Sequence, residues 1–159
     1  MRIGVLTGGG DCPGLNPAIK GVVFRAADFK YEVLGILDGW KGLVKGTTMP
    51  LGITDVEEII SKGGTILGTS RTNPFKKEED LKSVLANIKK LKLDAVVALG
   101  GEDTLGVANK LYKKGIHCVG VPKTMDNDLS ATDFTFGFDT SVTVAIDAVE
   151  RLRDTGRSH

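Results

Sequence analysis

The residues best suited to chemistry lie between Lys123 and Asp128, where a cation, a hydroxyl, an amide and two carboxylates are crowded together. An apolar run from Ile116 to Val121 precedes them and is ended by Pro122, as expected of a buried strand. In open parallel sheets, ligands bind just beyond the carboxyl ends of the strands. Carboxylates and a lysine at such a place are suited to handling a proton, a metal ion and a phosphate. The alternative is an Asx-rich turn that merely follows a strand, because Asp and Asn favour turns for local reasons.

A glycine-rich segment at Gly8–Asn16 carries a second candidate chemistry. It follows a predicted strand at 2–7 and precedes a predicted helix at about 17–29, an arrangement that presents free backbone N–H groups to a phosphate. The segment matches neither the Walker pattern nor the dinucleotide-binding pattern. A purely structural glycine turn is the alternative. Asp11 lies beside the glycines and would repel a phosphate, so we expect it to act through a metal ion or a hydrogen bond.

Two more segments combine glycines with functional side chains. The predicted strand 94–99 ends in Gly100-Gly101-Glu102-Asp103-Thr104, and a helix is predicted from Thr104 to about Lys114. Thr104 is a candidate N-cap, whereas the acidic pair suggests Mg²⁺, which favours one or two carboxylates plus substrate phosphates. The segment 63–71 begins with paired glycines and ends in Arg71. Arg71 is either a clamp that binds a phosphate through two hydrogen bonds or an exposed, solubilising side chain.

The remaining elements must position these segments. Strands are predicted at 32–37 and 116–121, with His117 as a structural residue of the latter. Helical segments are predicted at 38–46, 55–62 and 77–90. In the first, Trp40 is expected to be a packing residue. In the second, Thr54 and Glu57 are expected to form a capping box at the start of the helix. A last helix follows from the spacing of Val142 to Leu152. Strands and helices alternate, and the strands are apolar throughout. The pattern predicts one α/β domain, a parallel sheet covered by helices on both faces.

Composition narrows the class of function. The chain has 159 residues, a net charge of +1 and 41% hydrophobic residues, enough for one core. Without a basic run and with few aromatic residues, it is not expected to bind nucleic acid. No apolar window approaches the length of a membrane span, so no membrane partner is expected. Cys12 and Cys118 fit no metal-binding spacing, and we expect both to be reduced thiols in a cytoplasmic protein.

Four motifs, in this order, resemble those of 6-phosphofructokinases. They are Gly-Val-Leu-Thr-Gly-Gly-Gly-Asp-x-Pro-Gly-Leu-Asn at 4–16, Gly-Gly-Thr-x-Leu-Gly-Thr-Ser-Arg at 63–71, Gly-Gly-Glu-Asp-Thr at 100–104 and Pro-Lys-Thr-x-Asp-Asn-Asp at 122–128. Lipid kinases and NAD kinases carry a segment similar to the third motif, so it would be weak alone. Four ordered motifs spanning the chain are a strong resemblance. It implies the Rossmann-like N-terminal domain of a phosphofructokinase.

The resemblance implies a role for each candidate residue. Asp126 would be the general base that takes the proton from the 1-hydroxyl of fructose 6-phosphate, while Arg71 and Lys123 would offset charge during the transfer. Glu102 occupies the position of a Mg²⁺-binding acid. The implied donor-binding residues are Gly10, Asp103 and Thr104, and the implied substrate-binding residues are Thr124, Met125, Asp126 and Asp128.

The resemblance also bears on the phosphoryl donor. Relatives that use ATP usually carry Gly where Asp103 stands, whereas relatives that use pyrophosphate typically carry this Asp together with a Lys at the position of Lys123. A carboxylate there would repel the α-phosphate of a nucleotide, and the lysine suits a compact pyrophosphate. The resemblance therefore implies pyrophosphate as the donor and a reversible reaction. ATP as the donor, or a non-catalytic phosphate-binding half-domain, are the alternatives. Phe24 stands where allosteric relatives have a basic residue, so nucleotide regulation is not expected.

Family members are about twice as long as this chain. We therefore expect residues 1–159 to be the phosphoryl-donor-binding domain of a longer, two-domain protein. The resemblance implies that the full-length form is a homo-oligomer. Because the second domain holds much of the sugar-phosphate site, the 159-residue piece alone is expected to have no more than trace activity.

Overall fold

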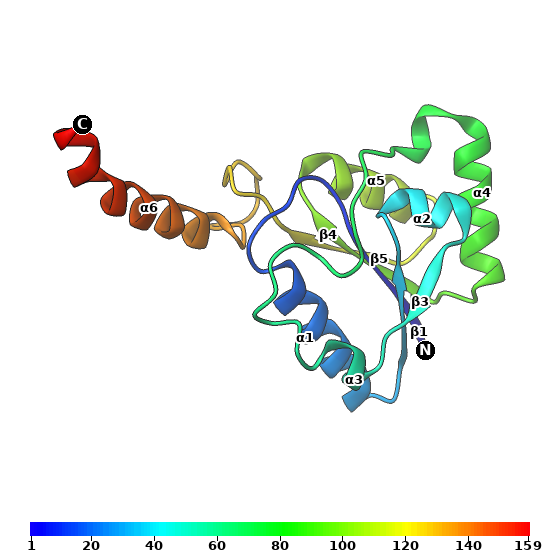
Figure 1. Cartoon of the computed structure of the whole chain (residues 1–159). Helices are drawn as coiled ribbons and strands as arrows, with labels where there is room; N and C mark the ends of the chain where they lie inside the picture. Colours follow the sequence, from blue (N-terminus) through cyan, green and yellow to red (C-terminus); the bar gives the residue numbers. More distant parts are fainter.

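The central element of the fold is a five-stranded sheet in the order β3-β2-β1-β4-β5, seen in a computed structural model that describes all residues from 1 to 159 (Figure 1). The strands are β1 (Arg2–Thr7), β2 (Glu32–Ile36), β3 (Thr48–Pro50), β4 (Ala95–Gly100) and β5 (Cys118–Pro122). Three neighbouring pairs are parallel, namely β1–β2, β1–β4 and β4–β5. The carboxyl ends of these four strands therefore share one edge of the sheet. The predicted parallel sheet is confirmed. The antiparallel edge strand β3 was not predicted, since three residues are too short for a periodic signal.

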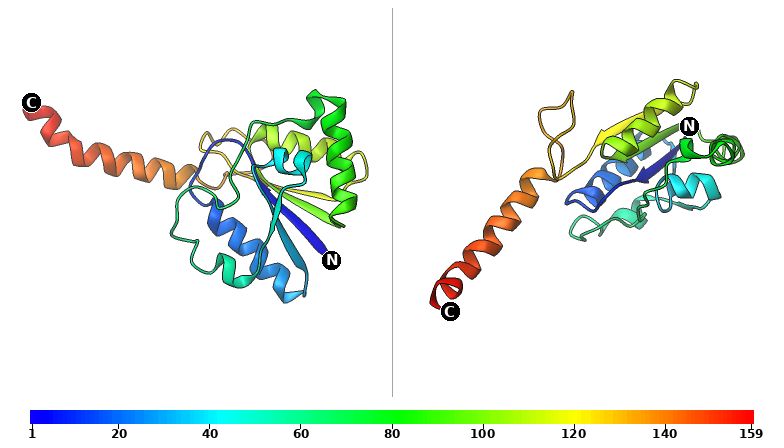
Figure 2. Two further views of the ribbon diagram at one scale, coloured as in Figure 1. Left: turned by 45° about the vertical axis from the view of Figure 1, so that its right-hand side comes forward. Right: turned by 90° about the horizontal axis from the view of Figure 1, so that it is seen from above.

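Helices cover both faces of the sheet, as predicted (Figure 2). They are α1 (Leu15–Asp28), α2 (Trp40–Lys45), α3 (Ile53–Val56), the 3₁₀ helix η1 (Pro74–Lys76), α4 (Glu78–Lys90), α5 (Glu102–Tyr112) and α6 (Phe138–Ser158). Alternate residues of each strand point to opposite faces. Val5 accordingly packs in the core with α1 and α3, whereas Leu6 packs in the core with α2, α4 and α5. Burial on both faces explains why the strands lack a polar side.

The last helix, α6, extends away from the sheet and the other helices (Figures 1 and 2). None of its residues is buried, and the apolar side chains of Val149 and Leu152 are each 67% exposed. The predicted helix is confirmed, although it continues through Ser158, beyond the predicted apolar stripe. None of the helices combines the length and the hydrophobicity that a membrane span requires.

Three local predictions were wrong. The helix predicted at 55–62 is the short α3, and its cap is Gly52, whose N–H donates to Oδ2 of Asp55 at 2.7 Å, in place of Thr54 and Glu57. α5 begins at Glu102 after an N-cap at Gly101, so Thr104 lies inside the first turn.

His117 lies immediately before β5, and its carbonyl oxygen accepts a hydrogen bond from the backbone N–H of Val96. Trp40, by contrast, packs in the core as predicted.

Because the core lies on the two faces of the sheet and excludes α6, two truncations of apolar side chains should differ in their effect on the free energy of unfolding. Leu6 is fully buried, so Leu6→Ala should lower the free energy of unfolding by about 2–5 kcal/mol. Val149→Ala on α6 removes only exposed surface and should change it by less than about 0.5 kcal/mol. Urea unfolding of both variants measures this difference. Equal losses would contradict the assignment of α6 to a position outside the core.

Candidate functional site

The carboxyl ends of β1, β4 and β5 bring three loops together around two adjoining pockets. The two pockets share the same four residues, Gly9, Gly10, Asp103 and Thr104. One has a volume of about 380 Å³ and the other of about 270 Å³. This is the edge at which open α/β sheets bind ligands.

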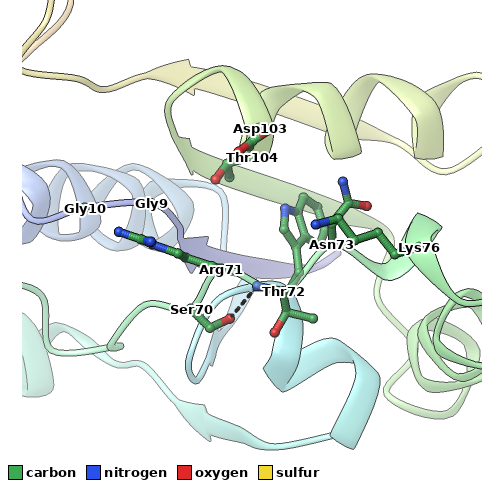
Figure 3. A pocket seen from close by; sticks show the side chains of 10 residues that line it. Gly9, Gly10, Ser70, Arg71, Thr72, Asn73, Lys76, Asp103 and Thr104 are labelled. Atoms are coloured by element: carbon green, nitrogen blue, oxygen red, sulfur yellow. Dashed lines mark hydrogen bonds between the residues drawn. The ribbon is translucent and has the colours of Figure 1, made fainter.

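The pockets differ in charge. The larger one, here called the cationic pocket, contains the side chains of Arg71 and Lys76 (Figure 3). The other residues that line this pocket and not the smaller one are Trp40, Ser70, Thr72 and Asn73. The smaller one, here called the acidic pocket, is lined in addition to the shared residues by Gly101, Glu102, Lys123, Thr124, Asp126 and Asp128. One pocket therefore suits a phosphate group, and the other suits a hydroxyl group or a metal ion.

The structure brings together every predicted site residue except one. Gly10, Asp103 and Thr104 lie between the pockets, Arg71 lines the cationic pocket, and the remaining residues line the acidic pocket. Met125 lines neither of these two pockets, and its side chain is 55% exposed. Met125 lies between Thr124 and Asp126, whose side chain and backbone are hydrogen-bonded to each other.

Lys123 connects the loops. It is only 3% exposed, and its Nζ donates a hydrogen bond of 2.7 Å to the carbonyl oxygen of Gly10. Its backbone N–H donates to the carbonyl oxygen of Gly100, so one residue at the end of β5 holds the ends of β1 and β4. Burial lowers the pKa of the Lys123 ammonium, while the nearby Cys12, Asp11 and Asp126 act in the opposite direction. The ammonium has two further protons with which to bind a ligand.

Thr104 fills the space between two glycines. A Cβ atom at Gly100 would lie 2.5 Å from Cβ of Thr104, and one at Gly8 would overlap the Thr104 side chain. These glycines are therefore required for close approach of β1, β4 and α5. The buried Thr104 acts as a spacer in the shared wall of the two pockets rather than as the N-cap that the sequence suggested.

Buried polar side chains support the loop that presents Arg71. The hydroxyl of Thr7 donates to the carbonyl oxygen of Gly68 at 2.8 Å. Nδ2 of Asn16 donates to the carbonyl oxygen of Lys62, and Oδ1 of Asn16 accepts from the N–H of Ile66. Thr7 and Asn16 were missed as supports of the site. A polar residue ending an otherwise apolar strand, as Thr7 does, is a signal that would have identified one of them.

The side chain of Arg71 is free to bind a ligand. It forms no salt bridge and no hydrogen bond within the chain, and Figure 3 shows it on the same side of the cationic pocket as Gly9 and Gly10. Ser70, immediately before it, donates to the carbonyl oxygen of Asp38 at 2.6 Å and so fixes the end of the loop. A guanidinium on a fixed loop is well suited to bind an anion.

The loop that carries Asp126 closes as a local turn. Oγ1 of Thr124 accepts a hydrogen bond from the N–H of Asp126 at 3.1 Å and donates a long one to Oδ2 of Asp126 at 3.4 Å. Asp126 and Asp128 are both exposed, so their carboxylates remain accessible in the acidic pocket. An accessible carboxylate in this position can accept a proton from a bound hydroxyl group.

Both cysteines are free. Burial raises the pKa of the Cys12 thiol, an effect that the Lys123 ammonium opposes and that Asp11 and Asp126 reinforce. Burial raises the pKa of Cys118 to about 11. Neither residue therefore offers a thiolate at neutral pH, and the chemistry of the site rests on its carboxylates and cations.

The carboxylates of the acidic pocket do not form a complete metal site. No group of three His, Cys, Asp or Glu side chains is close enough to hold a metal ion. Mg²⁺ needs less from a protein, because it is commonly bound by one or two carboxylates together with substrate phosphates. The exposed carboxylate of Glu102 in the acidic pocket fits a magnesium ion that is bound jointly with a phosphate ligand.

Comparisons with known proteins agree with this architecture. The family model described as Phosphofructokinase matches residues 2–159. The pyrophosphate–fructose 6-phosphate 1-phosphotransferase of Dictyoglomus thermophilum is 65% identical over 159 residues, and the ATP-dependent 6-phosphofructokinase 3 of Streptomyces coelicolor is 51% identical over 160 residues. A solved phosphofructokinase structure from Saccharomyces cerevisiae matches 99% of this chain with a TM-score of 0.87 at 29% identity.

The chain spans about half the length of these sequence relatives. Both match 100% of the chain, which covers 46% of the first and 47% of the second. It covers 24% of the yeast structure.

The lowered pKa of Lys123 predicts a pH effect on stability. Because its folded-state pKa lies below the ordinary value of 10.5, the unfolded chain binds more protons in the window between the two pKa values. Stability should therefore rise with pH in the window just below 10.5. In this pH window we expect the free energy of unfolding of the parent chain to rise relative to that of Lys123→Met, because the methionine side chain does not titrate. Urea unfolding at several alkaline pH values measures this difference, and parallel pH profiles would contradict the pKa shift.

Proposed function

Because the chain belongs to the phosphofructokinase family, we propose that it is the phosphoryl-donor-binding domain of an enzyme that transfers a phosphoryl group from pyrophosphate to the 1-hydroxyl of fructose 6-phosphate. The product is fructose 1,6-bisphosphate, and the reaction is reversible. The name of the Dictyoglomus thermophilum relative supports this donor and this acceptor. The observation that carries the proposal is the meeting of a cationic and an acidic pocket at Gly9, Gly10, Asp103 and Thr104.

The chemistry of phosphoryl transfer matches this division of charge. Such a transfer needs alignment of donor and acceptor and neutralisation of charge more than covalent participation of the protein. In the proposed arrangement Arg71 binds the phosphate being transferred from the cationic side, and Gly10 contributes its backbone N–H. Asp126 acts from the acidic side as the general base for the acceptor hydroxyl, while Thr124 and Asp128 help to orient the acceptor. Met125 is assigned only a peripheral contact with the substrate, because it lines neither pocket.

The proposal includes Mg²⁺ as a cofactor, with Glu102 as its ligand from this chain. A magnesium ion bound with the donor would offset the charge of the phosphate oxygens. Glu102 lies at the first position of α5 and lines the acidic pocket, where a carboxylate can reach a metal ion shared with phosphate.

Two residues favour pyrophosphate over ATP. Asp103 belongs to the shared wall of the pockets, so its carboxylate faces any chain of phosphates that extends across that wall. Lys123 is buried beside the glycine-rich loop and adds positive charge at the acidic side. ATP as the donor is the second candidate, because the Streptomyces coelicolor relative, 51% identical over the whole chain, is named as ATP-dependent.

The proposal extends to the whole protein. Because the chain covers less than half of its pyrophosphate-dependent relative, we place residues 1–159 as one domain of a longer, homo-oligomeric enzyme. With both cysteines free, we place that enzyme in the cytoplasm.

The proposed base can be tested in the full-length protein that contains this chain. Asp126→Ser should lower kcat by about two to four orders of magnitude, the usual range for loss of a general base. The KM for pyrophosphate should change far less, since the donor-binding residues are untouched. Steady-state kinetics at the pH optimum of each form measure both effects. Near-normal turnover of the variant would show that Asp126 only helps to position the substrate.

The proposed donor specificity predicts opposite effects of two substitutions. Asp103→Gly should relieve the repulsion of ATP, and Lys123→Gly should weaken the use of pyrophosphate. Close charges in a partly desolvated site can change affinity by orders of magnitude. Because both side chains would face the same phosphate chain, the double variant should deviate from additivity. The measurement is kcat/KM with each donor for the parent and the three variants.

Two outcomes would contradict the donor assignment. The first is a parent enzyme that already prefers ATP. The second is an Asp103→Gly variant with the same ratio of kcat/KM for the two donors as the parent. Asp94→Gly is a matched control, because this carboxylate lies at the opposite end of β4, where it accepts a hydrogen bond from the N–H of Arg2.

A further inference from the structure

Behind the loop that carries Asp126 lies a buried threonine to which no role has yet been assigned. Thr135 is 3% exposed, and its hydroxyl donates a hydrogen bond of 2.7 Å to the carbonyl oxygen of Thr124. Its backbone N–H donates to Oδ1 of Asn127 at 2.9 Å. Thr135 thus holds the loop at two residues, and Asp126 lies between them in the sequence.

The loop needs such support because its backbone is unusual. Asn127 has a φ of 51°, in the left-handed region that few residues other than glycine adopt. A strained conformation of this kind persists only where surrounding contacts fix it. The local bonds between Thr124 and Asp126 hold the turn together but do not attach it to the rest of the protein. Lys123 attaches the start of the loop to Gly10 and Gly100, and the contacts with Thr135 attach the following residues, Thr124 and Asn127.

The segment around Thr135 is itself anchored to the glycine-rich loop. Phe136 forms an isolated parallel bridge with Lys123, and its carbonyl oxygen accepts a hydrogen bond of 3.6 Å from Sγ of Cys12. The ring of Phe136 packs against Gly14, where an added Cβ atom would lie 2.9 Å from Cδ2 of the ring. The support behind Asp126 is therefore continuous with the loop that presents Gly10.

We propose that Thr135 is a positioning residue for phosphoryl transfer. Its hydroxyl holds the turn at Thr124 and its backbone N–H holds the turn at Asn127, and these two contacts place the carboxylate of Asp126 against the acceptor hydroxyl. This role rests on the proposed function, and Thr135 itself touches no substrate. A displacement of about 1 Å can cost on the order of 100-fold in rate, so loss of this support should appear in kcat.

Two substitutions separate the hydroxyl from the rest of the side chain. Thr135→Val keeps the shape but removes the donor, which leaves the carbonyl oxygen of Thr124 without its partner. Thr135→Ser keeps the hydroxyl and removes only a methyl group. In the full-length protein, Thr135→Val should lower kcat by about 10- to 100-fold, with the KM for pyrophosphate within about threefold of the parent. Thr135→Ser should retain kcat within about threefold of the parent.

Hydrogen exchange in the full-length protein gives a readout that does not depend on activity. In Thr135→Val, the hydrogen-bonded amides of Asp126 and residue 135 should exchange faster than in the parent, whereas the amides of β1 and β4 should not change. If Thr135→Val does not fold, Asn127→Gly takes its place. This variant permits the positive φ and removes only the second attachment, and it should produce the same loss of kcat and the same local increase in exchange.

The outcomes distinguish this proposal from the proposed function. Unchanged kcat and exchange in a folded Thr135→Val variant would overturn the role of Thr135 and leave the proposed function standing. A loss of kcat in Thr135→Ser equal to that in Thr135→Val would show that keeping the hydroxyl does not preserve the rate, and would also overturn it. A parent protein without phosphotransferase activity would overturn the proposed function, and the positioning role of Thr135 with it.

Discussion

The hydrogen bond from the Lys123 ammonium to the carbonyl oxygen of Gly10 is the contact on which the geometry of the site depends. It joins the loop after β5 to the loop after β1, which are far apart in the sequence. Burial of an ammonium group is costly unless the group is hydrogen-bonded and near opposite charge. The carbonyl oxygen of Gly10 and the carboxylates of Asp11 and Asp126 meet that requirement here. The same cation that orders the loops also places positive charge beside the carboxylates of the acidic pocket.

Few polar side chains are buried in this chain, and they support the site. They are Thr7, Asn16, Thr104, Lys123 and Thr135. Each is bonded to, or packed against, a loop at the carboxyl edge of the sheet. The apolar core on the two faces holds the strands, and these polar contacts then fix the loops where the strands end. The exposed groups Arg71, Glu102, Asp103 and Asp126 can thus keep defined positions while remaining accessible to a ligand.

The sequence predicted the elements whose signals are local, and it missed those that depend on distant partners. Uninterrupted apolar strands followed by glycines and acids were enough to place the candidate residues at one edge. The supporting role of Asn16 was not predictable in this way, because its partner Lys62 is 46 positions away and the contact has no periodic signature. Thr104 resembled a helix cap by position, but space between Gly8 and Gly100 decided its role. The short β3 exists because β2 offers it a free edge, and a three-residue segment carries no signal of its own.

We propose that pyrophosphate binds at the edge of the sheet formed by β1, β4 and β5. Calorimetric titration of the 159-residue chain with pyrophosphate and with ATP, each in the presence of Mg²⁺ at neutral pH, tests it most directly. The charges of Asp103, Lys123 and Arg71 predict saturable binding of one pyrophosphate, at least about tenfold tighter than that of ATP. Equal or tighter binding of ATP, or no binding of pyrophosphate, would contradict the account.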